Sequence, residues 1–424
     1  MTVTVMAIAI ALLIALRIPI AFAILGPCLL YMWTSGQSVG LAMRTATGGV
    51  NSWPLLAVPL FILVGVLATR AGIADRMFAL ALALLGRLRG ALGYVNVGVS
   101  LGFSWMNGSA LADAAGVGAI QVPQMVKNGY PRPFAIGLTA SSSVIGPIMP
   151  PSIPAVVFAS VAAVSTSALF AAAVVPAFII AMLLTAFVWF WARKREDLRS
   201  VRFSWREVGR TAVAGVGALL APVVILGGIL SGFFTPTEAA AVGALYMLLL
   251  GFLYRTLTVR NLPRVFADAA VTTASIMVIL GASALLGWIL ARERVPQTLA
   301  GLFLEISDSP IVFLLLVNVL LLVLGAVLEP TSALVIGVPV LLPVAVQLGI
   351  DPVHFGVIVV LNLMLGLLTP PIGGVLFVLS SVTRTPVAEV FRGVAPFLVP
   401  LAAALLLVTF APGLVLWLPG VLGL

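Results

Sequence analysis

The sequence predicts an all-α polytopic membrane protein, on the basis of its composition, its Gly and Pro content and a recurring pattern. Of the 424 residues, 62% are hydrophobic and only 8% are charged, whereas about a quarter of the residues in a soluble domain are charged. A water-soluble fold is therefore excluded. A bilayer core takes about 20 apolar residues per helix, so the chain can supply roughly a dozen membrane-embedded segments. The 40 Gly and 28 Pro indicate that several helices are interrupted.

Apolar segments follow one another along the whole chain. They span Val3–Trp33, Trp53–Ala68, Ala91–Met106, Ala110–Val126, Phe134–Ile148, Ile153–Ala192, Thr211–Leu230, Glu238–Tyr254, Val265–Leu290, Ile311–Leu328, Ala333–Leu348, Phe355–Leu368, Gly373–Val382 and Val394–Leu416. Several of them are too short to cross a bilayer. A short segment that ends at a double proline is typical of one arm of a re-entrant hairpin, which a membrane tolerates where protein or water covers the backbone. We expect two such hairpins.

The formal net charge of +9 is interpreted as a signal of orientation. One strongly charged connection, residues 193–210, separates a first half (1–192) from a second half (211–424) of a single membrane domain. Its basic residues are Arg193, Lys194, Arg195, Arg199, Arg202, Arg206 and Arg210. Basic residues beside apolar spans are retained in the cytoplasm, so this connection is predicted to be cytoplasmic in a bacterial inner membrane. Recognition of lipid headgroups or nucleic acid is the less favoured alternative, and no nucleic-acid partner is expected.

Several other classes of site are disfavoured. The single Cys28 and the single His354 exclude an internal disulfide and argue against a transition-metal site. No nucleotide-binding Gly-x4-Gly-Lys-Ser/Thr motif occurs, so the chain itself is not expected to use ATP. An intramembrane enzyme is disfavoured because no paired catalytic constellation is present. His354 is expected near a helix start, and Glu238 is expected to complete a capping box with Thr235.

The most informative feature of the sequence is an internal repeat. The stretch from Pro123 to Gly129 has a counterpart from Pro343 to Gly349, and both double prolines lie at the same distance from these stretches, so one offset of 220 residues relates the pairs. A chance match among common apolar residues is the alternative. Two related halves with broken helices are typical of secondary transporters, so we expect an inverted two-fold repeat with sites near mid-membrane.

The first helix interruption in each half offers oxygen ligands for a hard monovalent cation. A glycine after an apolar helix frees backbone carbonyls, and nearby hydroxyl, amide and carboxylate groups add oxygens that suit Na⁺. An acidic residue at membrane depth must face a cavity or have a partner; the alternative is that each acid only caps a helix N-terminus. The predicted cation neighbourhood comprises Asn107, Gly108, Ser109, Asp113, Glu329, Thr331, Ser332 and Gly366.

The second interruption in each half contains the double proline. Proline is tolerated in the first turn of a helix, so each double proline is predicted to end one hairpin arm and start the next. The new helix would offer free N–H groups and a positive dipole end to an anionic substrate; a packing kink without a ligand is the alternative. The predicted tip residues are Thr139, Ser141, Ser142, Ser143, Gly146, Pro150, Pro151, Ser152, Thr369, Pro370, Pro371, Gly373 and Gly374.

These motifs resemble a known family over nearly the whole chain. Asn107-Gly-Ser109-Ala-Leu-Ala-Asp113, the stretch from Thr139 to Ile153 with its Ile-Gly-Pro-Ile-Met-Pro-Pro-Ser core, and Phe234-Thr-Pro-Thr-Glu-Ala-Ala-Ala241 are similar to those of the large, dicarboxylate-type (DctM-like) membrane subunit of tripartite ATP-independent periplasmic (TRAP) transporters. The Leu-Thr-Pro-Pro-Ile-Gly-Gly stretch around Pro370 also matches.

The resemblance implies a function as well as a fold. It implies a sodium-driven elevator, in which a transport domain with two re-entrant hairpins moves against a scaffold and carries Na⁺ with an organic acid anion, C4-dicarboxylate-like or another carboxylate. It implies two partners, a small four-helix membrane subunit and a periplasmic substrate-binding protein, and no cofactor besides Na⁺ as coupling ion. A standalone Na⁺/anion transporter of related fold, working without a binding protein, is the alternative.

Overall fold

The computed structural model is helical throughout the part of the chain that it describes. It describes residues 2–16, 18–195, 198, 204–295, 297–298, 301 and 309–424. The first half contains α1 (Val3–Ala15), α2 (Ile20–Thr34), α3 (Val39–Val50), η1 (Trp53–Leu56), α4 (Ala57–Arg70), α5 (Ile73–Leu85), α6 (Ala91–Asn107), α7 (Ala110–Lys127), α8 (Arg132–Ser143), α9 (Ile153–Ala162) and α10 (Thr166–Ala192). Helix α9 and helix α10 are separate, although their sequence forms one apolar run.

The second half contains a similar number of described helices. They are α11 (Trp205–Leu230), α12 (Pro236–Leu253), α13 (Leu262–Arg292), α15 (Pro310–Val327), α16 (Pro330–Gln347), α17 (Pro352–Gly366), α18 (Gly374–Thr383), α19 (Val387–Val394), η2 (Ala395–Phe397), α20 (Leu398–Phe410) and α21 (Pro412–Leu422). Helix α11 begins at Trp205, inside the predicted basic connection. Residues 196, 197 and 199–203 of that connection lie outside the described residues.

Eight of the described helical segments are long and apolar enough to cross a membrane. They are Trp53–Arg70, Thr166–Ala192, Trp205–Leu230, Pro236–Leu253, Leu262–Arg292, Pro310–Val327, Pro330–Gln347 and Val387–Phe410. Helix α9 and helix α18, which follow the two double prolines, have only 10 residues each. A helix of that length rises only about 15 Å, half the thickness of a hydrocarbon core. Many large apolar side chains on the long helices are exposed, as expected of surfaces that face lipid.

Helix boundaries follow the local chemistry of the sequence. Thr235 and Glu238 form a capping box at the start of α12, with Pro236 in the first turn, so the predicted structural role of Glu238 is confirmed. His354 lies in the first turn of α17, capped by Asp351. Its Nε2 atom lies 2.8 Å from the Val408 carbonyl oxygen. Both residues therefore have roles in helix starts and packing.

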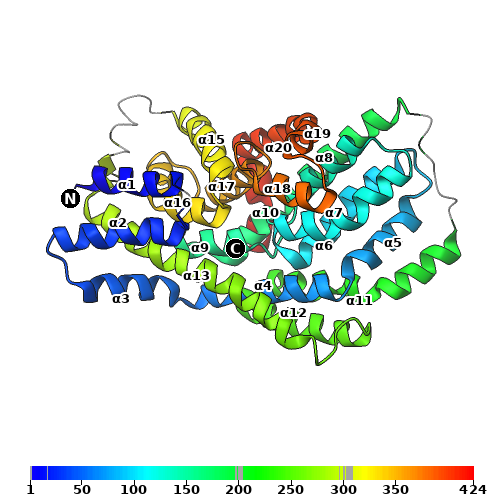
Figure 1. Cartoon of the computed structure of the whole chain (residues 1–424), viewed down its shortest axis with the longest axis horizontal. Helices are drawn as coiled ribbons and strands as arrows, with labels where there is room; N and C mark the ends of the chain where they lie inside the picture. The colour runs from blue at the N-terminus through cyan, green and yellow to red at the C-terminus, as the bar shows by residue number, and fades with distance from the viewer. Residues whose placement is uncertain are drawn as a thin grey trace.

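The helices form an elongated assembly in which segments distant in sequence lie together (Figure 1). Helix α13 runs beside α2, α3, α4 and α16. Each short helix after a double proline packs on the opposite half of the chain: α9 contacts α16 and α17, whereas α18 contacts α7 and α8. Each of these short helices thereby joins the two halves of the chain.

Candidate functional site

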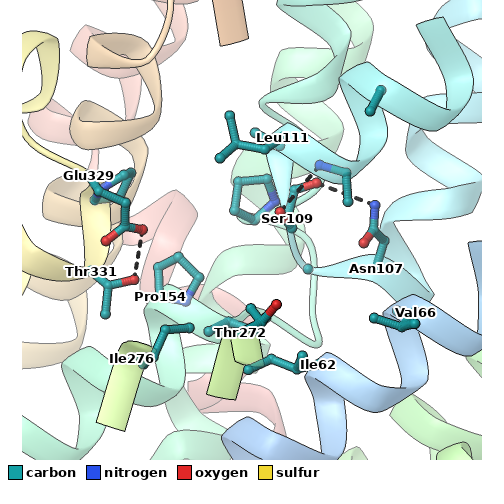
Figure 2. Close-up of a pocket in the computed structure, with 18 of the residues that line it drawn as sticks. Ile62, Val66, Asn107, Ser109, Leu111, Pro154, Thr272, Ile276, Glu329 and Thr331 are labelled. Atoms are coloured by element: carbon teal, nitrogen blue, oxygen red, sulfur yellow. Dashed lines mark hydrogen bonds between the residues drawn. The ribbon is translucent and has the colours of Figure 1, made fainter. Parts of the chain in front are cut away.

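A cavity of about 840 Å³ lies where the two halves meet. Its walls come from α4, the break between α6 and α7, the start of α9, the middle of α13, the break between α15 and α16, and the end of α17. Figure 2 shows side chains from these elements around the space. Of the residues predicted from the sequence, it is lined by Asn107, Gly108, Ser109, Glu329 and Thr331. The first interruptions of both halves thus meet at one site.

The first break is built by a glycine and two capping interactions. Helix α6 ends at Asn107, Gly108 adopts a left-handed conformation with φ of 59°, and Ser109 is the N-cap of α7. Ser109 Oγ accepts a hydrogen bond from Ala112 N at 3.4 Å, and the Asn107 side-chain amide donates to Ser109 O at 3.3 Å (Figure 2). Left-handed backbone strongly favours glycine, so the break is fixed by the sequence.

The second break places a carboxylate on the cavity wall. Helix α15 ends at Val327, and Glu329 is the N-cap of α16. Glu329 Oε1 accepts a hydrogen bond from Thr331 Oγ1 at 2.9 Å, and Oε2 accepts one from Ser332 N at 3.2 Å. Figure 2 shows Glu329 and Thr331 together at one side of the cavity. Glu329 therefore caps the N-terminus of α16 and also lines the cavity. The two roles considered for this acid, a helix cap and a cavity residue, are both present.

Asp113 lies in a different place. It is fully buried in the first turn of α7 and does not line the cavity. Neither of its carboxylate oxygens has a hydrogen-bond partner among the described residues. The Ser100 hydroxyl interacts with the carboxylate, but it donates its hydrogen bond to Ser142 Oγ, at 3.0 Å. Since Ser109 caps α7, Asp113 is no N-cap, and a buried carboxylate without donors requires a cation or a proton.

The hydroxyl-rich stretch of α8 faces the same buried region. Asn96 Nδ2 donates to Thr139 Oγ1 at 2.7 Å, and Ser142 Oγ donates to Asn96 Oδ1 at 2.8 Å. Ser143 Oγ donates to the backbone, whereas Ser141 Oγ has no partner among the described residues. Thr139 and Ser142 thus form a polar cluster with Asn96 and Ser100 of α6, and none of these residues lines the cavity.

The loops that contain the double prolines support the two breaks; Pro147 and Leu367 of these loops line the cavity, whereas the double prolines themselves do not. Pro150 and Pro151 are buried, and Gly108 packs against the backbone of Pro151. In the second half, the backbone N–H groups of Ile372 and Gly373 donate to Ala326 O at 3.1 and 3.3 Å.

The remaining predicted residues flank these contacts. Gly146 and Ser152 are buried in the first loop, Ser332 is buried in α16, and Gly366 packs directly on Gly325 of α15. Of the second loop, Pro370 and Pro371 are exposed, Thr369 and Gly374 half-buried. A ligand role for these tips stays a prediction.

Two charged residues of the cavity were absent from the predicted site. Arg70 at the end of α4 and Asp268 near the start of α13 both line the cavity and form an ion pair of 3.0 Å. Thr272 and Ser275 follow Asp268 on the same wall. Asp268 lies in an apolar run, so the rule that marked Asp113 as unusual applies to it equally. Arg70 ends an apolar helix, where a basic residue ordinarily marks only the membrane interface.

Comparison with known proteins agrees with this architecture. A family model described as the tripartite ATP-independent periplasmic transporter, DctM component, matches residues 7–414. The chain is 44% identical over 403 residues to the sialic acid TRAP transporter large permease protein SiaM of Vibrio cholerae, which covers 95% of this chain and 94% of that protein. It is 39% identical over 373 residues to the C4-dicarboxylate TRAP transporter large permease protein DctM of Pseudomonas aeruginosa, covering 88% and 87%.

A solved structure shares the fold. The crystal structure of the Alcanivorax borkumensis YdaH transporter matches with a TM-score of 0.62 at 17% identity, covering 91% of this chain and 88% of that chain. The relatives with high sequence identity are transporter permeases rather than enzymes. The chain therefore belongs to the DctM component family of tripartite ATP-independent periplasmic transporters, as a large multi-pass permease subunit of the bacterial inner membrane.

Proposed function

We propose that this permease takes up an organic acid anion together with Na⁺. In the proposed transporter it works with a small four-helix membrane subunit, and a periplasmic binding protein delivers the substrate. The relatives named above transport sialic acid and C4-dicarboxylates by their names, and both of these substrates contain a carboxylate. The substrate of this chain is accordingly an organic acid, of C4-dicarboxylate or another carboxylate type.

The observation on which the proposal rests is the meeting of both first interruptions at one cavity. Asn107 to Ser109 and Glu329 to Thr331 come from different halves of the chain and line the same 840 Å³ space. Broken helices that meet from two related halves are the usual place for substrate and coupling ions in secondary transporters. The cavity also has the volume of a small-molecule site.

Electrostatics supports a coupled cation. Asp113 is buried without a hydrogen-bond partner among the described residues, and hydroxyl groups of the α8 cluster lie in the same region. Carboxylate and hydroxyl oxygens are ligands that suit Na⁺, and a bound cation would offset the cost of burying this charge. We propose this region, beside the break at Gly108, as one place for Na⁺.

The packing of the short helices supports an elevator-like movement. Helix α9 packs on the second half, and α18 packs on the first half, as expected of an inverted repeat whose two hairpins exchange partners. We propose that α8–α9 and α17–α18 are re-entrant hairpins of one moving domain. Each net positive charge that enters through 100 mV contributes about 2.3 kcal/mol, enough for about fifty-fold accumulation before the sodium gradient is added.

Uptake in proteoliposomes tests the proposal. The chain would be reconstituted with and without its small subunit, and with and without the binding protein, under an inward Na⁺ or K⁺ gradient. We expect accumulation of labelled substrate only with all three proteins and Na⁺. Accumulation by this chain alone would establish the standalone alternative, and equal accumulation with K⁺ would contradict sodium coupling.

A further inference from the structure

One ion pair joins α4 to α13 on the wall of the cavity. Arg70 is the last residue of α4, and its Nη2 atom donates to Oδ2 of Asp268, near the start of α13, at 3.0 Å. Among the described residues that line the cavity, Arg70 is the only basic one. An anion that enters the cavity therefore meets one side chain of opposite charge on this wall.

The pair lies toward the cytoplasmic ends of its two helices. The connection from α12 to α13 contains Arg255 and Arg260, and basic residues beside apolar spans are retained in the cytoplasm. The turn after α4 lies at the same end of the molecule, because the Arg76 guanidinium of α5 is placed over the Tyr254 ring, 3.6 Å from its centroid. Helix α13 thus begins, and α4 ends at Arg70, on the cytoplasmic side.

The cavity extends from this end toward the middle of α13. The residues of α13 that line it fall between Asp268 and Ile279, whereas residues 280–286 are mostly buried in the packing with other helices. On α4 the lining residues run from Ile62 to Arg70, and Figure 2 shows Ile62 and Thr272 on the same side of the space. Arg70 and Asp268 are thus the cavity residues of these two helices closest to the cytoplasm.

The ion pair leaves most of the Arg70 guanidinium available to a ligand. An arginine has five N–H donors in a planar fork, and Asp268 is the only partner of this side chain among the described residues. A carboxylate in the cavity can therefore bind the remaining donors. The two side chains are 51% and 46% exposed, and an ion pair with that exposure contributes little to folding stability.

Asp268 limits how tightly such a carboxylate is held. Its negative charge, beside the guanidinium, offsets part of the attraction that an anion would experience at Arg70. Asp268 also takes a hydrogen bond from Nη2 that a ligand carboxylate could otherwise accept. A site on a transport path must bind its ligand weakly enough for the ligand to leave. A paired arginine meets this requirement better than an unpaired one.

We propose, resting on the function proposed above, that Arg70 receives the carboxylate of the transported anion at the cytoplasmic end of the cavity and that Asp268 promotes its release. Arg70 is the binding residue. Asp268 is a positioning residue that competes with the ligand for the same guanidinium. The two members of one ion pair thus act on the bound anion in opposite directions, Arg70 by attraction and Asp268 by competition.

Equilibrium binding to the full chain in lipid nanodiscs tests these opposing roles. The probes are radiolabelled succinate and N-acetylneuraminate at saturating Na⁺, and variants are compared for the acid that the wild type binds more tightly. Arg70→Gln should weaken binding about tenfold, the loss of one charged hydrogen bond, and Arg70→Lys should recover part of that loss. Asp268→Asn should tighten binding about fivefold by slowing dissociation. The double variant should bind as weakly as Arg70→Gln, because Asp268 acts through Arg70.

The opposite signs distinguish this role from a structural one. If the pair only tied α4 to α13, Arg70→Gln and Asp268→Asn would break the same bond and change anion binding in the same direction. Changes of the same sign, or an unchanged affinity in Asp268→Asn, would overturn the inference; with wild-type binding intact, the proposed function would stand. If the wild type bound neither acid at any Na⁺ concentration, the proposed function would fall, and this inference with it.

The matched control is an exposed ion pair outside the cavity. Arg210 and Glu207 form such a pair within α11, and neither of them lines the cavity. Arg210→Gln and Glu207→Gln should both leave anion binding unchanged. Because both pairs are exposed, all of these variants should melt close to the wild-type temperature, so that changes in affinity are separated from loss of folded protein.

Discussion

Gly108 lies directly against Pro151: a Cβ atom at Gly108 would be 2.7 Å from the Pro151 carbonyl oxygen. The first helix break and the first double-proline loop therefore touch, although helices α7 and α8 separate them in the chain. Since Gly108 also has φ of 59°, both its backbone conformation and its surroundings require glycine. Because Gly108 lines the cavity, this contact joins the loop to the cavity wall.

Gly108→Ala is expected to lower both stability and transport. The left-handed conformation costs an L-residue about 1–2 kcal/mol, and the new methyl group would push the break away from the loop. We expect a lower melting temperature and a loss of most Na⁺-driven uptake in proteoliposomes. Gly98→Ala is the matched control, because a Cβ at this exposed position of α6 meets no atom within 4 Å. A Gly108→Ala variant with the uptake rate of the Gly98→Ala protein would contradict the role assigned to this contact.

Asp113→Asn is expected to separate sodium binding from folding. In K⁺ buffer the variant should unfold at the same temperature as the wild type or at a higher one, because a buried unpaired charge is removed. In Na⁺ buffer the wild type should be stabilised by ion binding, and the variant should need about tenfold more Na⁺ for the same stabilisation. Thermal unfolding across a Na⁺ titration at constant ionic strength measures both effects.

The control for this experiment is another acid in the first turn of a helix. Asp75 occupies that position in α5 and is exposed, so Asp75→Asn should leave the Na⁺ titration unchanged. If Asp113→Asn retained the wild-type response to Na⁺, the sodium region would have to lie elsewhere along the cavity.

Gly137→Ala is expected to disrupt the contact between α8 and α19. A Cβ at Gly137 would overlap the Gly393 carbonyl oxygen, and one at Gly393 would overlap the Pro133 carbonyl oxygen, so the two backbones are in direct contact. Arg132 strengthens the same junction by donating from Nε to Thr385 Oγ1 at 3.1 Å. Overpacking a tight contact costs about 1–3 kcal/mol. The expected result is a reduced yield of monodisperse protein in size-exclusion chromatography and a lower melting temperature.

Gly209→Ala provides the comparison for that variant. Gly209 lies on an exposed part of α11, where a Cβ meets no atom within 4 Å, and alanine is favoured over glycine inside a helix. This protein should be as stable as the wild type. Equal melting temperatures for the two variants would show that α8 and α19 can move apart to accommodate the added methyl group without loss of stability.

Much of the helical architecture is predictable from local sequence, whereas the set of residues that line the cavity is only partly predictable. The breaks at Gly108 and at Glu329 were predicted, because a glycine with positive φ and a capping acid act within a few residues of chain. The pairing of Arg70 with Asp268 was not, because helical periodicity gives the face of a residue and not the helix that will cover it. Asp113 and Ser109 share a face of α7 by spacing, but only Ser109 lines the cavity.

The sequence by itself determined that this protein lies in a lipid bilayer and where its helices end. Hydrophobic composition alone requires a bilayer, and Gly, Pro and capping residues act on their own turn of backbone. The tertiary structure decided which of those interruptions meet, since the packing of α9 on α16 and of α18 on α7 joins segments from opposite halves of the chain. Contacts of that kind depend on the shapes of two helix surfaces at once, which no single stretch of sequence contains.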